Sequence, residues 1–226
     1  MGVQSVSLAR LSLETYLIRE QPILWRVIQA VERVAAGVLL IIALPGLLIT
    51  ALIVRVLSGR PPLIAHRRVG YRGRDVWVLK LRTMWPSNSG PLRGSPFMER
   101  IETDSVAHIK SRIDPRVTSR FALFCRKYSI DELPQLWQVV TGEMALVGPR
   151  PVTATEIEAH YGSSAAQLLS VKPGITGLWQ VKGRNRLRRL QRKRLDLFMI
   201  RRWSVSLYLL ILLVTLPRVL TGKDAW

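Results

Sequence analysis

An aspartate and a glutamate stand side by side near the middle of this 226-residue chain, and they are its only adjacent pair of acids. They are Asp131 and Glu132. Two neighbouring carboxylates can divide the work of a phosphoryl transfer, because one can attack phosphorus while the other binds a divalent metal. The same sequence also fits an ordinary helix start, since Ser129 and Glu132 have the spacing of a capping box. From spacing alone we favour the helix start.

Basic residues on a stiffened backbone flank this acid pair along the chain. Arg116 follows Asp114-Pro115, and Arg150 lies between Pro149 and Pro151. Proline restricts the backbone, so less entropy is lost when the planar arginine fork meets phosphate oxygens. We interpret both arginines as candidate diphosphate contacts, and either sequence is also typical of a plain turn.

A third motif, at residues 172–185, combines a Pro-Gly turn, glycines that permit close backbone approach, and basic ends. It fits a phosphate loop, and it equally fits a tight turn that packs Trp179 into the core. The sequence has no G-x-x-x-x-G-K-[ST], G-x-G-x-x-G or D-x-D motif, and its three histidines lack metal-ligand spacing. A nucleotide-dependent enzyme would therefore hold phosphates through arginines, helix N-termini and a lightly ligated metal.

The composition combines strong positive charge with high apolar content. Lys and Arg number 34 against 15 Asp and Glu, the formal charge is +19, and 48% of the residues are hydrophobic. A soluble nucleic-acid binder accounts only for the charge, and a multi-span transporter accounts only for the apolar content. A basic protein on an anionic membrane accounts for both. Because Cys125 is the single cysteine, no intramolecular disulfide is possible, and we expect a cytoplasmic working region.

Residues 34–54 form an uncharged apolar stretch. At about 1.5 Å per residue, such a helix reaches across the roughly 30 Å of membrane hydrocarbon. Pro45 lies at its midpoint and predicts a kink or a break. Two arrangements fit: a kinked helix that spans the membrane, which composition slightly favours, and a re-entrant helix that returns to the same face. Arginines concentrate after the stretch and place that flank in the cytoplasm. We expect an amphipathic segment at residues 1–33 before it.

The other elements follow from local patterns. Two short strands, Pro62–His66 and Asp75–Arg82, are predicted to form a β-hairpin. Residues 182–202 are rich in Lys and Arg, with Asp196 as the one acid, which suits a helix at lipid headgroups or a solvated basic face. Residues 207–216 are apolar but too short to span, so we expect an interfacial or core helix. The predicted fold class is α+β, mainly helical.

In their order along residues 34–226, these motifs resemble those of the bacterial sugar transferases, or monotopic phosphoglycosyl transferases, which start polyprenyl-linked glycan assembly. Each motif alone is weak, and the ordered set is very specific. The matching sequences are the apolar helix with Pro45, Arg68-Val69-Gly70, KLRTM at 80–84, DPRVT at 114–118, SIDELPQLW at 129–137, VGPRP at 147–151 and KPGITGLWQV at 172–181.

The resemblance implies a mechanism. Asp131 matches the family's nucleophile, which attacks the sugar-bearing phosphate of a UDP-sugar, releases UMP and passes the phosphosugar to polyprenyl (undecaprenyl) phosphate. Glu132 matches the Mg²⁺ ligand, with Asp131 beside it, and Arg150 resembles the phosphate clamp. Further anion contacts are expected at Lys80, Arg82 and Arg116.

The resemblance also implies a topology. A re-entrant helix broken at Pro45 enters the bacterial inner membrane from the cytoplasmic face, and residues 55–226 form the catalytic domain with C-terminal interfacial helices. The expected partners are UDP-sugar, polyprenyl phosphate and membrane lipid, and nucleic acid is not expected. The product would feed exopolysaccharide, O-antigen or glycoprotein glycan assembly. The alternative is a membrane-tethered basic protein that binds nucleic acid or anionic lipid.

Overall fold

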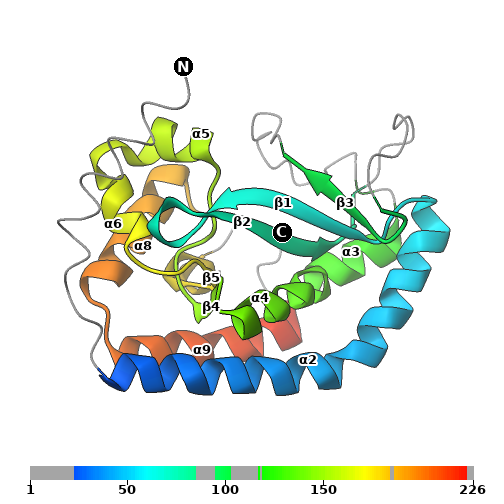
Figure 1. Cartoon of the computed structure of the whole chain (residues 1–226), viewed down its shortest axis with the longest axis horizontal. Coiled ribbons are helices and arrows are strands. Elements are labelled where there is room, and N and C mark those ends of the chain that lie inside the picture. The colour runs from blue at the N-terminus through cyan, green and yellow to red at the C-terminus, as the bar shows by residue number, and fades with distance from the viewer. Residues whose placement is uncertain (1–22, 85–94, 103–116, 118, 184–185, 223–226) are drawn as a thin grey trace.

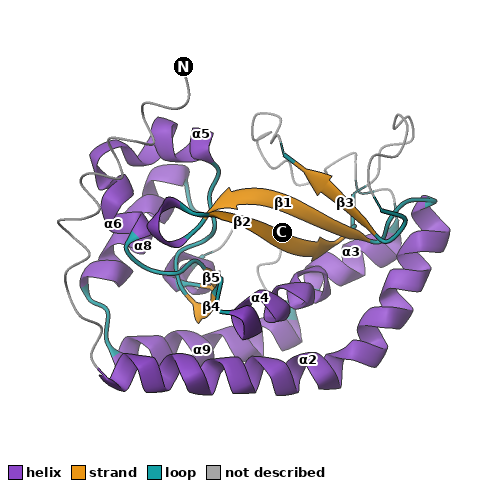
Figure 2. Cartoon of the chain, viewed as in Figure 1, coloured by secondary structure: helices purple, strands orange, loops and turns teal. Residues whose placement is uncertain are grey.

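The computed structural model describes residues 23–84, 95–102, 117, 119–183 and 186–222. Helices predominate among these residues, and the strands form a three-stranded and a two-stranded sheet, in agreement with the mainly helical α+β class (Figures 1 and 2). The elements in chain order are α2 (Ile23–Ser58), β1 (Leu63–Val69), η1 (Tyr71–Gly73), β2 (Asp75–Leu81), β3 (Met98–Ile101), α3 (Arg120–Lys127), η2 (Ile130–Gln135), α4 (Leu136–Thr141), β4 (Ala145–Val147), α5 (Ala154–Glu156), η3 (Ile157–Tyr161), η4 (Gly162–Ser164), α6 (Ala165–Leu169), β5 (Gly174–Thr176), α7 (Leu178–Lys182), α8 (Arg189–Arg201) and α9 (Val205–Thr221).

Helix α2 is longer than the apolar stretch that predicted it. It begins at Ile23 rather than at Val34, so the expected division at residue 33 falls inside one helix. Residues 1–22, the rest of the expected amphipathic segment, lie outside the described residues.

Pro45 lies inside α2 without ending it. The expected break is therefore a bend within one continuous helix, and Figure 1 shows α2 running along one side of the molecule and then turning upward. Proline removes a single backbone donor. In the turn that follows, the Thr50 hydroxyl donates to the Gly46 carbonyl at 2.7 Å. A hydroxyl that bonds to the carbonyl four residues earlier often bends a helix, so this bond fits a bend in this part of α2.

Most of the apolar surface of α2 is not covered by the rest of the protein. Among the described residues, α2 is the one helix long and apolar enough to cross a bilayer, and only 11% of its most apolar stretch is buried. Ile41, Ile42, Leu52 and Val56 are 65–74% exposed. A core helix of a soluble domain buries its apolar stripe. The exposed surface of α2 therefore indicates membrane association.

β1 and β2 form the predicted hairpin, pairing antiparallel along their whole length. The sequence did not predict β3, which pairs parallel with β1 and gives the strand order β2-β1-β3. β2 is therefore an edge strand. Val76 and Val78 on β2 bury their side chains in a core cluster with residues of α2 and α4. Lys80 follows on the same face, because side chains alternate along a strand.

The two expected C-terminal helices are present. α8 carries the basic run, and α9 carries the apolar run and extends it at both ends. α9 buries Tyr208 and Ile211. It leaves a row of leucines exposed, at positions 209, 210, 213, 216 and 220.

A buried carboxyl holds the first part of α2 against α9. Glu32 on α2 is 5% exposed, and its Oε2 accepts hydrogen bonds from the Tyr208 hydroxyl on α9 and from the Leu146 N–H on β4. Trp25 and Trp203 pack around the Tyr208 ring. α2 and α9 consequently lie side by side along the lower edge of Figure 1.

Removing the Tyr208 hydroxyl is expected to destabilise the fold by about 1–3 kcal/mol, because Glu32 then loses a donor in a site closed to water. The test is the thermal midpoint of Tyr208→Phe in detergent micelles, at about 2–4 °C per kcal/mol for a chain of this size. Tyr71→Phe, on the partly exposed turn η1, is the matched control. Equal midpoints for the two variants would contradict a stabilising role for the Glu32–Tyr208 hydrogen bond.

Candidate active site

Asp131 and Glu132 lie on η2, a 3-10 helix, rather than in the first turn of an α-helix. Ser129 precedes η2 in a left-handed conformation with φ of 56°, and its side chain does not cap the helix. The predicted capping box is wrong, because an N-cap hydroxyl reaches the helix amides from an extended backbone. Instead, the Glu132 N–H donates to the Ser129 carbonyl at 3.0 Å. Left-handed non-glycine residues are uncommon and concentrate at functional sites.

The Asp131 carboxyl is removed from water. Asp131 is 8% exposed, and burial is the largest cause that raises its pKa to about 6. The charge of Glu132 raises this pKa further, whereas the charges of Lys80 and Arg126 lower it. Asp131 is therefore a candidate nucleophile, because burial removes the water that would otherwise stabilise the charge of its carboxylate.

Lys80 reaches the acid pair from β2. Its Nζ lies 2.6 Å from Glu132 Oε1, and the two side chains are 25% and 28% exposed. The fold thus brings together three of the residues that the sequence predicted, from two segments far apart in the chain. Because this ion pair is partly open to solvent, a soluble ligand can reach it.

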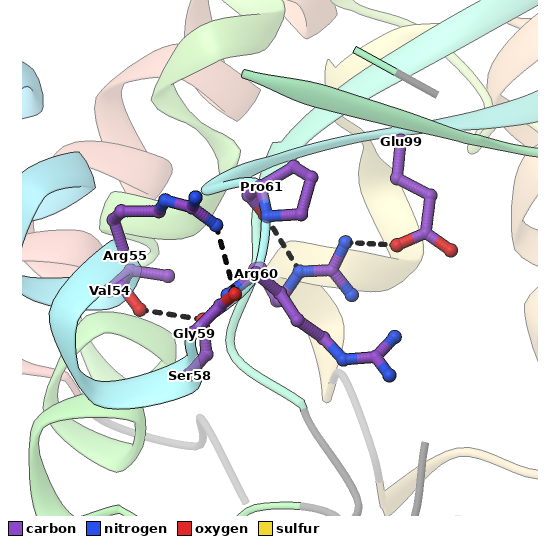
Figure 3. A network of polar contacts seen from close by, with 8 residues as sticks. Val54, Arg55, Ser58, Gly59, Arg60, Pro61 and Glu99 are labelled. Carbon is purple, nitrogen blue, oxygen red and sulfur yellow. Dashed lines mark hydrogen bonds and ion pairs between the residues drawn. The ribbon is translucent and has the colours of Figure 1, made fainter. Parts of the chain in front are cut away.

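Arg82 has a different role in the structure from the anion contact expected of it. Its Nε donates to the Pro61 carbonyl at 2.8 Å, and its guanidinium also pairs with Glu99 on β3. Arg82 is 5% exposed. Figure 3 shows this network beside the end of α2, where the Arg55 guanidinium donates to the Gly59 carbonyl at 2.9 Å. The Arg82 side chain therefore joins the exit of α2 to the sheet.

Arg150 follows β4, which pairs parallel with β5. This pairing places the segment before Arg150 against the glycine motif of residues 172–185. The Gly148 N–H donates to the Thr176 carbonyl and the Gly174 N–H donates to the Pro149 carbonyl, both at 2.9 Å. A Cβ added to Gly174 would lie 2.0 Å from the Gly148 nitrogen. The glycines thus permit close approach of one backbone to the other.

Trp179 belongs to the motif of residues 172–185, lies on α7, and is 4% exposed. The Arg192 guanidinium lies over its ring, 4.8 Å from the centroid. Trp179 therefore packs into the core, as one of the two interpretations predicted, but Gly174–Thr176 form strand β5 instead of the expected tight turn.

Arg150 acts electrostatically on a buried aspartate that no sequence motif assigns to a site. Asp196 on α8 is 1% exposed; the Tyr161 hydroxyl donates to its Oδ2 at 3.4 Å, and its Oδ1 has no hydrogen-bond partner among the described residues. Burial raises the pKa of Asp196 to about 8, against the Tyr161 hydrogen bond and the charges of Arg150 and Arg192, which lower it. The sequence carried one signal for the burial of Asp196. Met199 follows three residues later, and residues three apart share a helix face, which here is the buried face of α8.

His66 on β1 lies where the charges of several predicted motifs meet. Burial lowers its pKa to about 4, and the charges of Arg68, Lys80, Arg150 and Arg82 lower it further. Lys80 and Arg150, which come from separate motifs, therefore act on one region of the protein. Converging fixed positive charge beside low-dielectric walls is the environment that attracts a diphosphate. In the sequence, His66 is only one of three histidines without metal-ligand spacing.

The donors available for a divalent cation are the Asp131 and Glu132 carboxylates. Within residues 23–84, 95–102, 117, 119–183 and 186–222, no group of three or more His, Cys, Asp or Glu side chains could enclose a metal. Mg²⁺ commonly binds one or two carboxylates and completes its shell with water and substrate phosphates. The two carboxylates fit such a lightly held ion. Arg116, the remaining predicted contact, lies outside the described residues.

The sequence as a whole is similar to one family of proteins. The family described as bacterial sugar transferase matches residues 24–222. The UDP-galactose-lipid carrier transferase of Erwinia amylovora is 40% identical over 201 residues, which cover 86% of this chain and 40% of that protein. The exopolysaccharide production protein ExoY of Rhizobium meliloti is 37% identical, over 85% of this chain and 84% of that protein. A UDP-glucose:undecaprenyl-phosphate glucose-1-phosphate transferase of Caulobacter vibrioides is 37% identical, over 88% of this chain and 71% of that protein.

Asp196→Asn is expected to flatten the dependence of stability on pH. The Asp196 pKa rises from 3.8 to about 8 on folding, so between these values the unfolded chain ionises this group and the folded protein does not. Stability is therefore lost as pH rises from about 4 to about 8. The test compares thermal midpoints across this range with those of Asp75→Asn, a control at an exposed ion pair with Arg67. Parallel pH curves for the wild type and Asp196→Asn would contradict the raised pKa.

Proposed function

Because the chain belongs to the bacterial sugar transferase family, we propose that it transfers a phosphosugar from a UDP-sugar to polyprenyl phosphate. The products are UMP and a polyprenyl-diphosphate sugar, the first membrane-bound intermediate of exopolysaccharide, O-antigen or glycoprotein glycan assembly. The observation that carries the proposal is the buried Asp131 carboxyl beside the Lys80–Glu132 ion pair. A relative whose name specifies UDP-glucose and undecaprenyl phosphate supports these substrate classes.

Asp131 is the nucleophile of the first step. One of its oxygens attacks the sugar-bearing phosphorus of the UDP-sugar, and the bond from that phosphorus to the bridging oxygen breaks. UMP leaves with the electron pair of the broken bond. The phosphosugar stays on the Asp131 carboxylate as an acyl phosphate.

Polyprenyl phosphate completes the cycle. One of its phosphate oxygens attacks the same phosphorus, and the bond to the Asp131 oxygen breaks. The electron pair returns to the carboxylate, which restores the enzyme. Both nucleophiles are anionic, so neither step requires a general base.

The neighbouring residues hold the charges that this reaction brings together. Lys80 offsets the charge of Glu132 at 2.6 Å, which lowers the repulsion felt by an approaching diphosphate. Arg150 is the proposed phosphate clamp, and its action on His66 in common with Lys80 supports a shared anion-binding region. Asp131 and Glu132 would hold Mg²⁺, which when bound supplies positive charge to the phosphates.

The lipid acceptor requires that this site meet the membrane. We propose that α2 enters the bacterial inner membrane from the cytoplasmic face and returns to that face at the bend that contains Pro45. The continuous but bent helix, its exposed apolar side chains and the arginines that follow it support this topology. The exposed leucines of α9 suit the same interface, and the basic residues of α8 suit lipid headgroups.

Asp131→Asn is expected to lower UMP release at least about 1,000-fold, because an amide cannot act as the nucleophile. UMP is measured with a panel of UDP-sugars, Mg²⁺ and polyprenyl phosphate in detergent. The thermal midpoint should not fall, since the substitution removes a buried ionisable group. Asp75→Asn, at an exposed strand position, is the control and should keep full activity.

The same assay separates enzyme from binding protein, because nucleic-acid binding needs no UDP-sugar. A radiolabelled donor should also leave phosphosugar on Asp131 when the acceptor is omitted. Product formation without any adduct at Asp131 would refute the two-step mechanism.

Cysteine labelling tests the topology. If α2 is re-entrant, Arg26→Cys and Arg55→Cys, both at exposed positions, should react with an impermeant maleimide only from the cytoplasmic side. The native Cys125 provides a quiet background, because it is buried and burial raises its pKa to about 11. Labelling of the two positions from opposite sides would instead establish a helix that spans the membrane.

A further inference from the structure

The side chain of Gln138 makes a two-point contact with the edge of β2. Gln138 lies on α4 and is 2% exposed. Its Nε2 donates to the Trp77 carbonyl at 2.8 Å, and its Oε1 accepts from the Leu79 N–H at 3.0 Å. Residues two apart in a strand present their peptide groups to the same edge. The carboxamide of Gln138 therefore occupies the place that a neighbouring strand would take, on the edge of β2 that β1 leaves uncovered.

The backbone of Gln138 is itself held in place. Its carbonyl accepts hydrogen bonds from the Met144 N–H at 3.0 Å and from the Thr141 hydroxyl at 3.2 Å. On either side of it, Leu136 and Val139 pack in the core cluster that also contains Val76 and Val78 of β2. The contact thus joins two elements that are packed along their length.

Both ends of this contact lie next to the residues of the active site. Leu79 immediately precedes Lys80, and α4 directly continues η2, which carries Asp131 and Glu132. We infer that Gln138 is a positioning residue that sets Lys80 against the acid pair. The effect of Gln138 on kcat, which this inference predicts, rests on the proposed transfer reaction.

Apolar packing alone does not set this position. The contacts of Val76 and Val78 with Leu136 and Val139 are non-directional, so they define the position of β2 along α4 less sharply than hydrogen bonds do. Hydrogen bonds weaken steeply as distance and angle depart from ideal values. The two bonds of Gln138 therefore fix the register between β2 and α4, and with it the 2.6 Å approach of Lys80 to Glu132.

Gln138→Met removes both bonds while keeping a side chain of similar length. We expect kcat for UMP release to fall about 10- to 100-fold, because a displacement of about 1 Å at a reacting centre can cost 10²-fold. The KM for the UDP-sugar should change by less than about threefold, since the binding residues remain. Gln167→Met is the matched control: Gln167 is also buried and its amide donates to a backbone carbonyl, that of Leu197, away from β2.

A double-variant cycle distinguishes positioning from a loss of stability. If Gln138 acts through Lys80, Gln138→Met should have little further effect on kcat in a Lys80→Met background. Full additivity of the two effects, or an equal loss of kcat in Gln167→Met, would overturn the inference.

Chemical labelling tests the same inference without activity. Acetic anhydride labelling, followed by mass spectrometry, should modify Lys80 about two- to fivefold faster in Gln138→Met than in the wild type, the range expected for loss of a partly exposed ion pair. An unchanged rate would overturn the inference. If the wild-type protein released no UMP, the proposed function would fail, and the labelling result would still decide the role of Gln138.

Discussion

The carboxyl of Asp131 is kept out of water beside a second negative charge, and this arrangement is unfavourable unless a cation lies close by. Lys80 supplies that cation from a strand far away in the chain. The hairpin must therefore be held in a fixed position against η2 and α4. The shared core of α2, β2 and α4, together with the amide of Gln138, provides that constraint.

The same core connects the candidate active site to the apolar helix α2. Ala36 of α2 packs with Val76, Val78, Leu136 and Val139, so the long apolar helix shares a core with β2 and α4, the elements next to the acid pair. The contact of Glu32 with α9 and β4 holds the first part of α2 in place. In the proposed reaction, this arrangement would let a soluble nucleotide and a lipid phosphate meet at one site, because the site is built against the exposed apolar helix α2.

The arginines show how residues of one type take different roles according to burial. Arg82 is closed off by contacts with Glu99 and Pro61 and strengthens the junction between α2 and the sheet. Arg150 is partly exposed and acts on both His66 and Asp196. The backbone pairing of β4 with β5 places it there, and glycines are required at that pairing because a side chain would not fit.

Local patterns in the sequence were enough to predict the hairpin, the apolar and basic C-terminal helices and the presence of an apolar helix around residues 34–54, because alternation, apolar runs and proline act over neighbouring residues. The tertiary structure alone decided the left-handed turn at Ser129, the pairing of β3 with β1, the ion pair of Arg82 and the burial of Asp196. The last three depend on which distant segment lies opposite, and side-chain burial and hydrogen bonding across such contacts leave no periodic signal in the sequence. Whether a charged residue faces a ligand or a partner within the protein is settled only when the chain has folded.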